Sequence, residues 1–222
     1  MSAPIQTLLL VGLATVGVTA VPTPKLPSES RGGYLSACST DNSPKCKCPA
    51  GTTLQQSTTQ AVILADVADV ADIMGSYQDT AWFGESPAYV TGPDNTVGSS
   101  RTMIGGTPEG EAEFTEALYE YECDESGFKM AYTLENAPIS YTDPDTGESG
   151  SYAGYWDILL VHGSDDATYV KWGIYACFTT DEVDGIEAFH EGAITNVEAM
   201  LAENGLSDGF SKEPMTIELF LF

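Results

Sequence analysis

The spacing of apolar residues predicts one long helix near the C-terminal end, over residues 179–205. The apolar positions recur every three or four residues and are Val183, Ile186, Phe189, Ile194, Val197 and Leu201, with Ala193 and Met200 widening the stripe. Thr179 and Glu182 fit a capping box at the start, and Gly205 supplies a left-handed stop. Burying this stripe contributes on the order of 10 kcal/mol before chain entropy is subtracted, so upstream elements must supply an apolar surface.

The residues before this helix follow the pattern of strands separated by turns. A first strand is predicted at residues 52–60, followed by a helical stretch at 61–77 that breaks at Gly75 and Ser76. Six further strands are predicted at residues 88–91, 98–105, 111–123, 128–136, 151–163 and 167–179. Consecutive hairpins form an antiparallel sheet, and the final helix is the natural cover for one of its faces.

The two ends of the chain differ from this middle part. Residues 5–18 form an apolar run that is too short to span a bilayer, and small residues at Val18 and Ala20 predict a signal peptide at 1–20. Residues 21–51 form a leader and a cysteine-containing segment, and its first part is rich in Pro, Ser and Gly. One folded domain is expected at 52–206. The tail at 207–222 alternates weakly and either adds a strand or lies loose.

Composition narrows the classes of partner. The chain has 222 residues, of which 33 are acidic and 8 basic, giving a formal net charge of −25. Nucleic acid and anionic membrane surfaces would be repelled, so neither nucleic-acid binding nor membrane insertion is expected. A negative surface of this kind is typical of a soluble, extracellular protein. We expect a secreted monomer or weak dimer.

Five cysteines in a secreted chain predict at least one disulfide and one unpaired thiol. Cys38, Cys46 and Cys48 lie close together in the sequence, whereas Cys123 and Cys177 lie in separate strand-like segments. A metal site made from the three clustered cysteines is the alternative. The oxidising compartment and the lack of a nearby histidine favour disulfides. No metal and no cofactor are predicted, since no phosphate-binding glycine loop or dinucleotide fingerprint is present.

Three stretches, in this order and spacing, resemble the START-like (SRPBCC) superfamily, specifically its polyketide-cyclase/dehydrase and pollen-allergen-like branch. They are residues 71–83 ending in TAWF; VGSSRTMIGG with EFTEALYEYE; and MAYTLENAPISY followed by YWDILLV and VKWGIYACF. The resemblance covers about residues 56–206. It implies an α+β helix-grip fold, in which a curved seven-stranded antiparallel sheet surrounds the long C-terminal helix and leaves a cavity. Such proteins bind sterols, lipids, hormones, flavonoids or polyketides, and a minority catalyse cyclisation, dehydration or isomerisation.

The resemblance directs attention to Arg101 and Glu116, because related proteins have an arginine and a glutamate here that point into the cavity. Strict alternation from residue 111 to 123 assigns one face to Phe114, Glu116, Leu118, Glu120 and Glu122, and the other to Thr115, Ala117, Tyr119, Tyr121 and Cys123. The pattern does not say which face is inside. If Glu116 is inside, Arg101 is its expected partner, because an isolated buried carboxylate is expensive. The pair either orders the sheet, anchors a ligand oxygen, or serves as a catalytic pair.

Further ligand-binding candidates are Tyr132, Trp156, Trp172 and His190, which combine apolar surface with a polar tip. For His190 and for His162, a structural role is favoured over general-base catalysis, because no nucleophile motif accompanies either residue.

The implied fold also suggests a disulfide pairing. The first strand of a helix-grip sheet pairs antiparallel with the last, so either Cys46 or Cys48 would reach Cys177. Cys38 would then pair with the remaining cysteine of the two, and Cys123 would be unpaired. A bridge closing so long a loop stabilises by roughly 4 to 5 kcal/mol in the chain-entropy model.

Three functions are consistent with these features. The first is a secreted carrier of a small hydrophobic ligand, such as a lipid, sterol or polyketide-like molecule. The second is a secreted polyketide cyclase, dehydratase or isomerase that uses Arg101 and Glu116. The third is an acidic protein that acts through protein partners and has a filled core, and this one predicts that no cavity exists.

Overall fold

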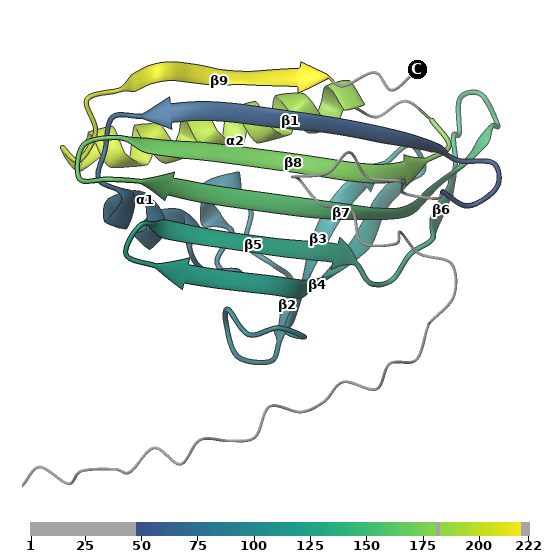
Figure 1. The fold of residues 1–222 in the computed structure, drawn as a ribbon. Helices are drawn as coiled ribbons and strands as arrows, with labels where there is room; N and C mark the ends of the chain where they lie inside the picture. Colours follow the sequence, from purple (N-terminus) through teal and green to yellow (C-terminus); the bar gives the residue numbers. More distant parts are fainter. Residues whose placement is uncertain (1–47, 181–182, 219–222) are drawn as a thin grey trace, which may run out of the picture. The chain divides into compact units, whose positions relative to one another are not determined.

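A computed structural model describes residues 48–180 and 183–218 of the protein (Figure 1). The predicted signal peptide, Cys38 and Cys46 lie outside the described residues. The elements follow in the order β1 (Thr53–Ile63), α1 (Val67–Met74), a 3-10 helix η1 (Ala81–Phe83), β2 (Tyr89–Thr91), β3 (Ser100–Thr107), β4 (Gly110–Asp124), β5 (Gly127–Leu134), β6 (Ile139–Thr142), β7 (Ser149–Gly163), β8 (Thr168–Phe178), α2 (Val183–Glu203) and β9 (Phe210–Glu218).

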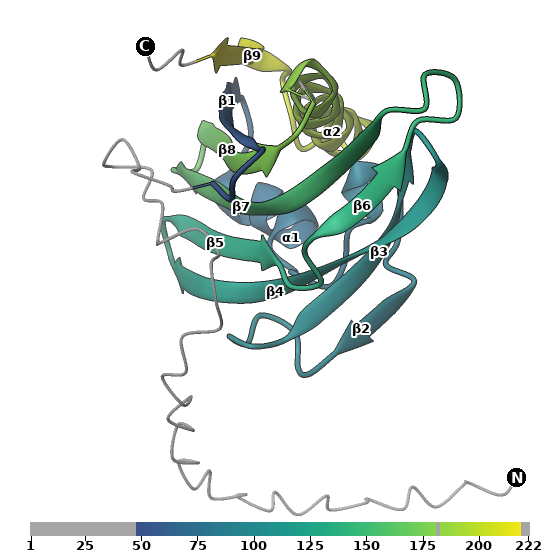
Figure 2. The same ribbon diagram turned by 90° about the vertical axis from the view of Figure 1, so that its right-hand side faces the viewer.

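All of the strands belong to one antiparallel sheet with the order β2-β3-β4-β5-β7-β8-β1-β9, in which β6 pairs separately with β7. The seven strands from β2 to β1 in this order correspond to the expected helix-grip sheet, and β6 and β9 are additional. Figure 2 shows the sheet bending so that α1 and α2 lie on its concave side. The fold is therefore α+β, with a long C-terminal helix held by a curved sheet, as predicted.

The start of the domain differs slightly from the prediction. Alternate residues of β1 are buried as far as Ile63, so Ala61–Ile63 are strand, and the prediction of a helical stretch from residue 61 is wrong there. Helix α1 begins only at Val67, because the Asp66 side chain accepts a hydrogen bond from the Ala68 amide at 2.8 Å and caps the helix.

Strand β4 contains a bulge that the predicted alternation does not include. The pairing of β4 with β5 shifts between Leu118 and Glu120, so Tyr119 is an extra residue. Beyond it the faces exchange: Tyr121 packs against the core, whereas Glu120 forms an ion pair with Lys129 at 2.8 Å. The assignment of Glu120 to the same face as Glu116 is therefore wrong, because one additional residue reverses the side-chain direction.

Helix α2 begins at Val183, four residues later than the predicted cap. Thr179 Oγ1 accepts a hydrogen bond from the Ser151 amide at 2.7 Å, so this side chain joins the sheet and the capping prediction for Thr179 is wrong. Glu182 lies outside the described residues. Gly205, at φ +69°, ends the helix as predicted, and the Leu206 amide donates to the Leu201 carbonyl at 2.9 Å. Ile194, Val197 and Leu201 are completely buried against the sheet.

The C-terminal tail forms β9, which pairs antiparallel with β1 and so adds a strand to the sheet. Phe210 packs against the core, and the hydroxyl groups of Thr59 and Thr216 are 2.9 Å apart. Strand β1 is therefore an interior strand.

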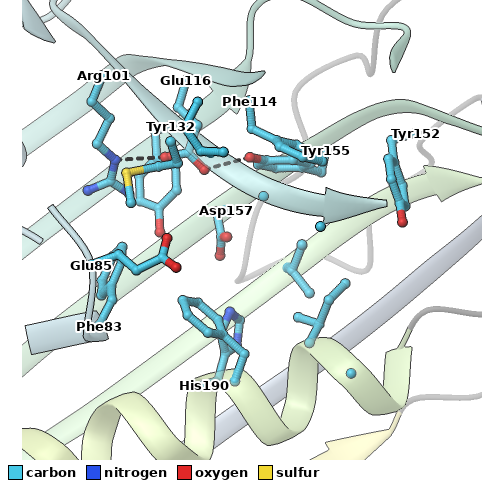
Figure 3. A pocket seen from close by; sticks show the side chains of 18 of the residues that line it. Phe83, Glu85, Arg101, Phe114, Glu116, Tyr132, Tyr152, Tyr155, Asp157 and His190 are labelled. Atoms are coloured by element: carbon cyan, nitrogen blue, oxygen red, sulfur yellow. Dashed lines mark hydrogen bonds and ion pairs between the residues drawn. The ribbon is translucent and has the colours of Figure 1, made fainter. Parts of the chain in front are cut away.

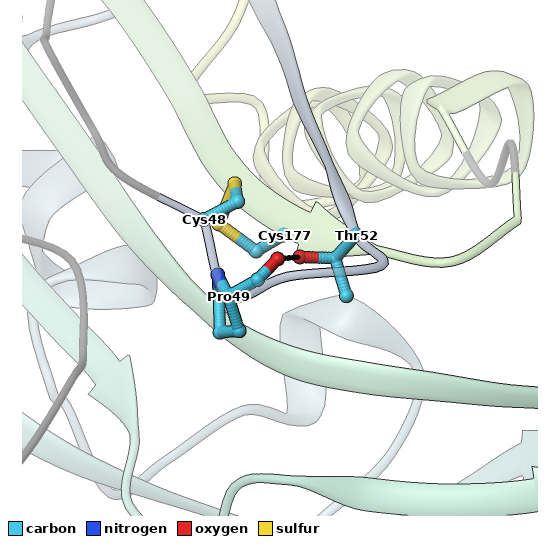
Figure 4. Close-up of a disulfide and its surroundings, with 4 residues drawn as sticks. All are labelled: Cys48, Pro49, Thr52 and Cys177. Atoms are coloured by element: carbon cyan, nitrogen blue, oxygen red, sulfur yellow. Dashed lines mark hydrogen bonds between the residues drawn. A yellow bond between two sulfur atoms is a disulfide. The ribbon is translucent and has the colours of Figure 1, made fainter.

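One disulfide joins Cys48, just before β1, to Cys177 near the end of β8 (Figure 4). Their Cα atoms are 5.3 Å apart, and the bridge closes a sequence separation of 129 residues. This confirms the expected partner of Cys177 and selects Cys48 over Cys46. Cys48 is consequently unavailable as a metal ligand. Cys123 is an exposed free thiol, as predicted.

No helix among the described residues is long and apolar enough to cross a lipid bilayer.

Candidate ligand-binding cavity

A cavity of about 710 Å³ lies between the concave face of the sheet and the first half of α2. Strands β3, β4, β5, β7 and β8 form its walls. The last residue of η1, Phe83, and the next two residues, Gly84 and Glu85, also line it, and α2 contributes Gly185, Ile186, Phe189 and His190. The second half of α2 fills the core, whereas the first half leaves this space open. A cavity of this size contradicts the hypothesis of a filled core.

The part of the cavity near β6 and the end of β8 is apolar. Its walls come from Phe114, Tyr152, Ile174, Phe178 and Ile186. The ring of Tyr152 lies 5.6 Å from that of Phe114 and 4.9 Å from that of Phe178, measured between centroids. Such a surface favours a ligand with a substantial hydrophobic portion.

Arg101 and Glu116 form a buried ion pair in the cavity wall (Figure 3). They are register partners on β3 and β4, and Arg101 Nε donates to Glu116 Oε2 at 2.7 Å. Arg101 Nη1 donates to the Tyr77 carbonyl oxygen at 2.8 Å, and Tyr155 Oη donates to Glu116 Oε1 at 2.6 Å. The pair points inward as expected, and neighbouring wall groups already occupy much of its hydrogen-bonding capacity.

The surroundings stabilise the charge of the Arg101 guanidinium. The guanidinium carbon lies 4.5 Å from the ring centroid of Tyr132 and 4.6 Å from that of Tyr77, which are cation–π distances. Burial alone would lower the pKa of Arg101, but the Glu116 carboxylate beside it raises that pKa above its ordinary value. Burial and the charge of Glu116 raise the pKa of Tyr155 well above its usual range, so its hydroxyl remains a donor.

The cavity contains a second buried carboxyl group, that of Asp157, which the sequence interpretation missed. Asp157 lies on β7 opposite Tyr132 of β5, and its Oδ1 accepts a hydrogen bond from Trp172 Nε1 at 2.7 Å. Burial, reinforced by the charge of Glu116, raises the pKa of Asp157 well above its ordinary value. The available signal was a single carboxylate within the long apolar strand SYAGYWDILLVHG.

His190 reaches the same part of the cavity from α2. Its ring stacks on that of Trp172, with centroids 3.9 Å apart and an interplanar angle of 13°. Its side chain is buried, and Nδ1 has no hydrogen-bond partner among the described residues. Burial lowers the pKa of His190 to about 3, so the imidazole is neutral at physiological pH.

Five of the six predicted ligand-binding residues line the cavity: Arg101, Glu116, Tyr132, Trp172 and His190. Trp156 does not. It precedes the inward-facing Asp157 on β7, so its side chain projects from the other face of the sheet, where it packs with Ala131, Ile158 and Tyr175. His162, near the end of β7, is exposed and lies outside the cavity lining.

Comparison with protein families gives a match to the START domain over residues 54–220 of the 222. The chain belongs to the START domain family. The matched range includes β9, which pairs with β1 in the sheet. START domains typically bind hydrophobic ligands, which agrees with the position and lining of the cavity.

Solved structures with similar folds include a protein from Nitrosospira multiformis, with a TM-score of 0.50 and 18% identity over 68% of this chain and 98% of that one. Norcoclaurine synthase from Thalictrum flavum gives a TM-score of 0.46 and 12% identity over 69% and 98% of the two chains. Ara h 8.0201 gives a TM-score of 0.48 and 10% identity over 68% of this chain and 100% of that one. At these identities the similarities concern the fold alone. No curated protein matches the chain.

Proposed function

We propose that this START domain protein is a secreted carrier that holds one small hydrophobic ligand between the sheet and α2. The supporting observation is the cavity of about 710 Å³, which falls within the size range of small-molecule sites and has mainly aromatic and aliphatic walls. A lipid, sterol or polyketide-like molecule is the class of ligand that suits such a lining.

Two features support secretion. The predicted signal peptide at residues 1–20 precedes a leader, and the disulfide between Cys48 and Cys177 is of a kind that persists in oxidising compartments. Mass spectrometry of the protein recovered outside its cells is expected to show a chain that begins at Val21. A chain that keeps residues 1–20, or that stays inside the cell, would contradict this part of the proposal.

We rank the enzymatic alternative second because of the contacts of Arg101 and Glu116. A cyclase, dehydratase or isomerase would need one of them to polarise a substrate oxygen or transfer a proton. Arg101 Nε and Nη1, and both carboxylate oxygens of Glu116, already bond to each other or to the wall. Turnover of the bound molecule by the wild type, and its loss in a folded Glu116→Gln variant, would reverse this ranking.

The first experiment is native mass spectrometry of the protein purified from its own source, followed by solvent extraction. We expect a one-to-one adduct of an apolar molecule. A bare mass, together with no binding of an added hydrophobic dye such as Nile red, would contradict the carrier function.

A pair of glycine variants tests whether the ligand lies in this cavity. Gly185 and Gly192 are both on α2, and an added Cβ at either meets no neighbouring atom within 4 Å, but only Gly185 lines the cavity. Gly185→Phe should therefore weaken dye binding at least tenfold, whereas Gly192→Phe should leave it unchanged. Equal effects of the two substitutions would place the ligand elsewhere.

A further inference from the structure

Acidic side chains outnumber basic ones in the cavity lining. Three carboxyl groups line it, those of Glu85, Glu116 and Asp157, against one guanidinium, that of Arg101. The ion pair with Glu116 neutralises Arg101, and burial keeps His190 uncharged. The whole chain carries a formal charge of −25 in addition. An anionic ligand group would therefore enter a site with no unpaired positive charge among its described lining residues, whereas a cation would meet a favourable potential.

Polar side-chain atoms that can accept further hydrogen bonds lie at the end of the cavity opposite its apolar part. The Asp157 carboxyl group receives one side-chain hydrogen bond, from Trp172, although a carboxylate can accept several. The buried Nδ1 of His190 has no partner among the described residues, and the phenol of Tyr132 lines the same end of the cavity. Figure 3 shows Asp157, Tyr132 and His190 directed into the same space, with Glu85 beside them.

These groups have the chemistry to hold an ammonium group. A carboxylate supplies the counter-charge, while a phenol oxygen and a neutral imidazole nitrogen can each accept an N–H hydrogen bond. Aromatic rings of Phe83, Tyr132, Trp172 and Phe189 surround this end of the cavity, and cations are attracted to aromatic faces. An alcohol would find hydrogen bonds here but would gain nothing from the charge.

We propose that this end of the cavity binds the protonated amine of an otherwise apolar ligand, with Asp157 as its counter-ion. The inference rests on the proposed carrier function and specifies the ligand class. Before an amine binds, burial and the neighbouring Glu116 charge raise the pKa of Asp157 well above its usual value, so the counter-charge develops as the amine binds. An ammonium group in contact with Asp157 would restore its ionised form.

The test compares three probes that share one chain and differ in head group: decylamine, 1-decanol and decanoate. Isothermal titration calorimetry at pH 7 and 150 mM NaCl is expected to give one site per chain, with decylamine binding at least tenfold tighter than 1-decanol and decanoate weakest. Competition between decylamine and 1-decanol would establish that both occupy the same site rather than the acidic surface.

Asp157→Asn provides the matching variant, because its amide oxygen can still accept the hydrogen bond from Trp172. We expect decylamine affinity to fall at least tenfold and 1-decanol affinity to stay within threefold of wild type. Asp165→Asn, on the exposed turn between β7 and β8, changes the net charge equally and should alter neither.

The outcomes separate the two proposals. If 1-decanol and decanoate bind but decylamine has no advantage, or if Asp157→Asn keeps that advantage, the amine inference is overturned and the carrier function stands. If none of the three probes binds, the carrier function fails and the amine inference fails with it. The wild-type comparison decides the matter even if Asp157→Asn does not fold.

Discussion

Arg101 and Glu116 are exposed by only 2% and 7%, yet both are charged. Removing two charges from water costs several kcal/mol each, and their close geometry and additional hydrogen bonds offset that cost only as long as both partners are present. The pair therefore fixes the positions of these two side chains in the cavity wall. Removing one partner alone should destabilise the folded protein strongly.

Replacing Glu116 with Gln should accordingly lower the free energy of unfolding by about 3 to 5 kcal/mol, because Arg101 would remain buried without a counter-charge. The double variant Arg101→Met/Glu116→Gln should regain more than half of that loss. Urea denaturation of the three proteins measures both effects. A single variant that stays within 1 kcal/mol of wild type would show that water or another group compensates the guanidinium.

His190 makes stability depend on pH in a calculable direction. Burial lowers its pKa to about 3 in the folded protein, against about 6.5 in an unfolded chain, so the unfolded state binds more protons between these values. The stability that comes from a neutral His190 is fully present above pH 6.5 and is lost as the pH falls. Phe can keep the stacking contact with Trp172 and does not titrate.

Between pH 5.5 and 4, wild type should therefore lose about 1.4 kcal/mol per pH unit more than His190→Phe, as measured by urea denaturation at each pH. Above pH 7 the difference between the two proteins should not change with pH. Parallel losses below pH 5.5 would show that His190 reaches water and protonates in the folded state.

At the residue scale, the sequence revealed some of the site and missed its second carboxyl group. Arg101 and Glu116 were anticipated from the family resemblance, because alternation along the strand left open whether Glu116 faces inward. Asp157 was overlooked, since one acidic residue in an apolar strand does not show by itself whether it is buried. Trp156 was included among the ligand-binding candidates because the sequence does not rank aromatic residues by their distance from the cavity. In the sheet, Trp156 and Asp157 project from opposite faces.

The disulfide between the segment just before β1 and the end of β8 has a large expected effect on stability. It joins residues that are 129 positions apart, so it strongly restricts the unfolded chain. The variant Cys48→Ala/Cys177→Ala should lose roughly 4 to 5 kcal/mol of unfolding free energy by the chain-entropy model. Cys123→Ala, at an exposed free thiol, is the control and should change stability by less than about 0.5 kcal/mol. Urea midpoints that agree between the double variant and this control would contradict the expectation.

The elements also show where local sequence stops being informative. Turn residues and the alternation of apolar and polar residues located nearly every strand, because residues close together in the sequence determine a hairpin. The bulge at Tyr119 has no such signature: no glycine or proline accompanies it, and the pairing with β5 alone reveals the extra residue. The start of α2 was predicted too early for a related reason, since a contact with Ser151, 28 residues away, uses the Thr179 hydroxyl group.

The net charge of the whole molecule affects the stability of the folded state through long-range repulsion rather than through a single contact. With 33 acidic and 8 basic residues, the folded protein carries strong self-repulsion, which is relieved in part when the chain expands on unfolding. Raising the salt concentration from 10 to 200 mM NaCl shortens the Debye length from about 30 Å to below 10 Å and weakens this repulsion.

The melting temperature should therefore rise by several degrees over this range of salt, as followed by circular dichroism. Sodium sulfate at equal ionic strength would separate screening from general salt effects, because sulfate also strengthens hydrophobic burial. A melting temperature that falls with added NaCl would mean that favourable ion pairs outweigh the repulsion.

The bridge between Cys48 and Cys177 also determines how the domain would respond to a pulling force applied at its two ends. Tension entering at Cys48 passes through the sulfur atoms to Cys177, so β1 to β7 lie inside a closed covalent loop and bear no load. Only the end of β8, α2 and β9, roughly 40 residues, can be extended, to about 150 Å instead of about 600 Å for the reduced chain. Force would thus peel β9 and α2 away and open the cavity while most of the sheet stayed folded.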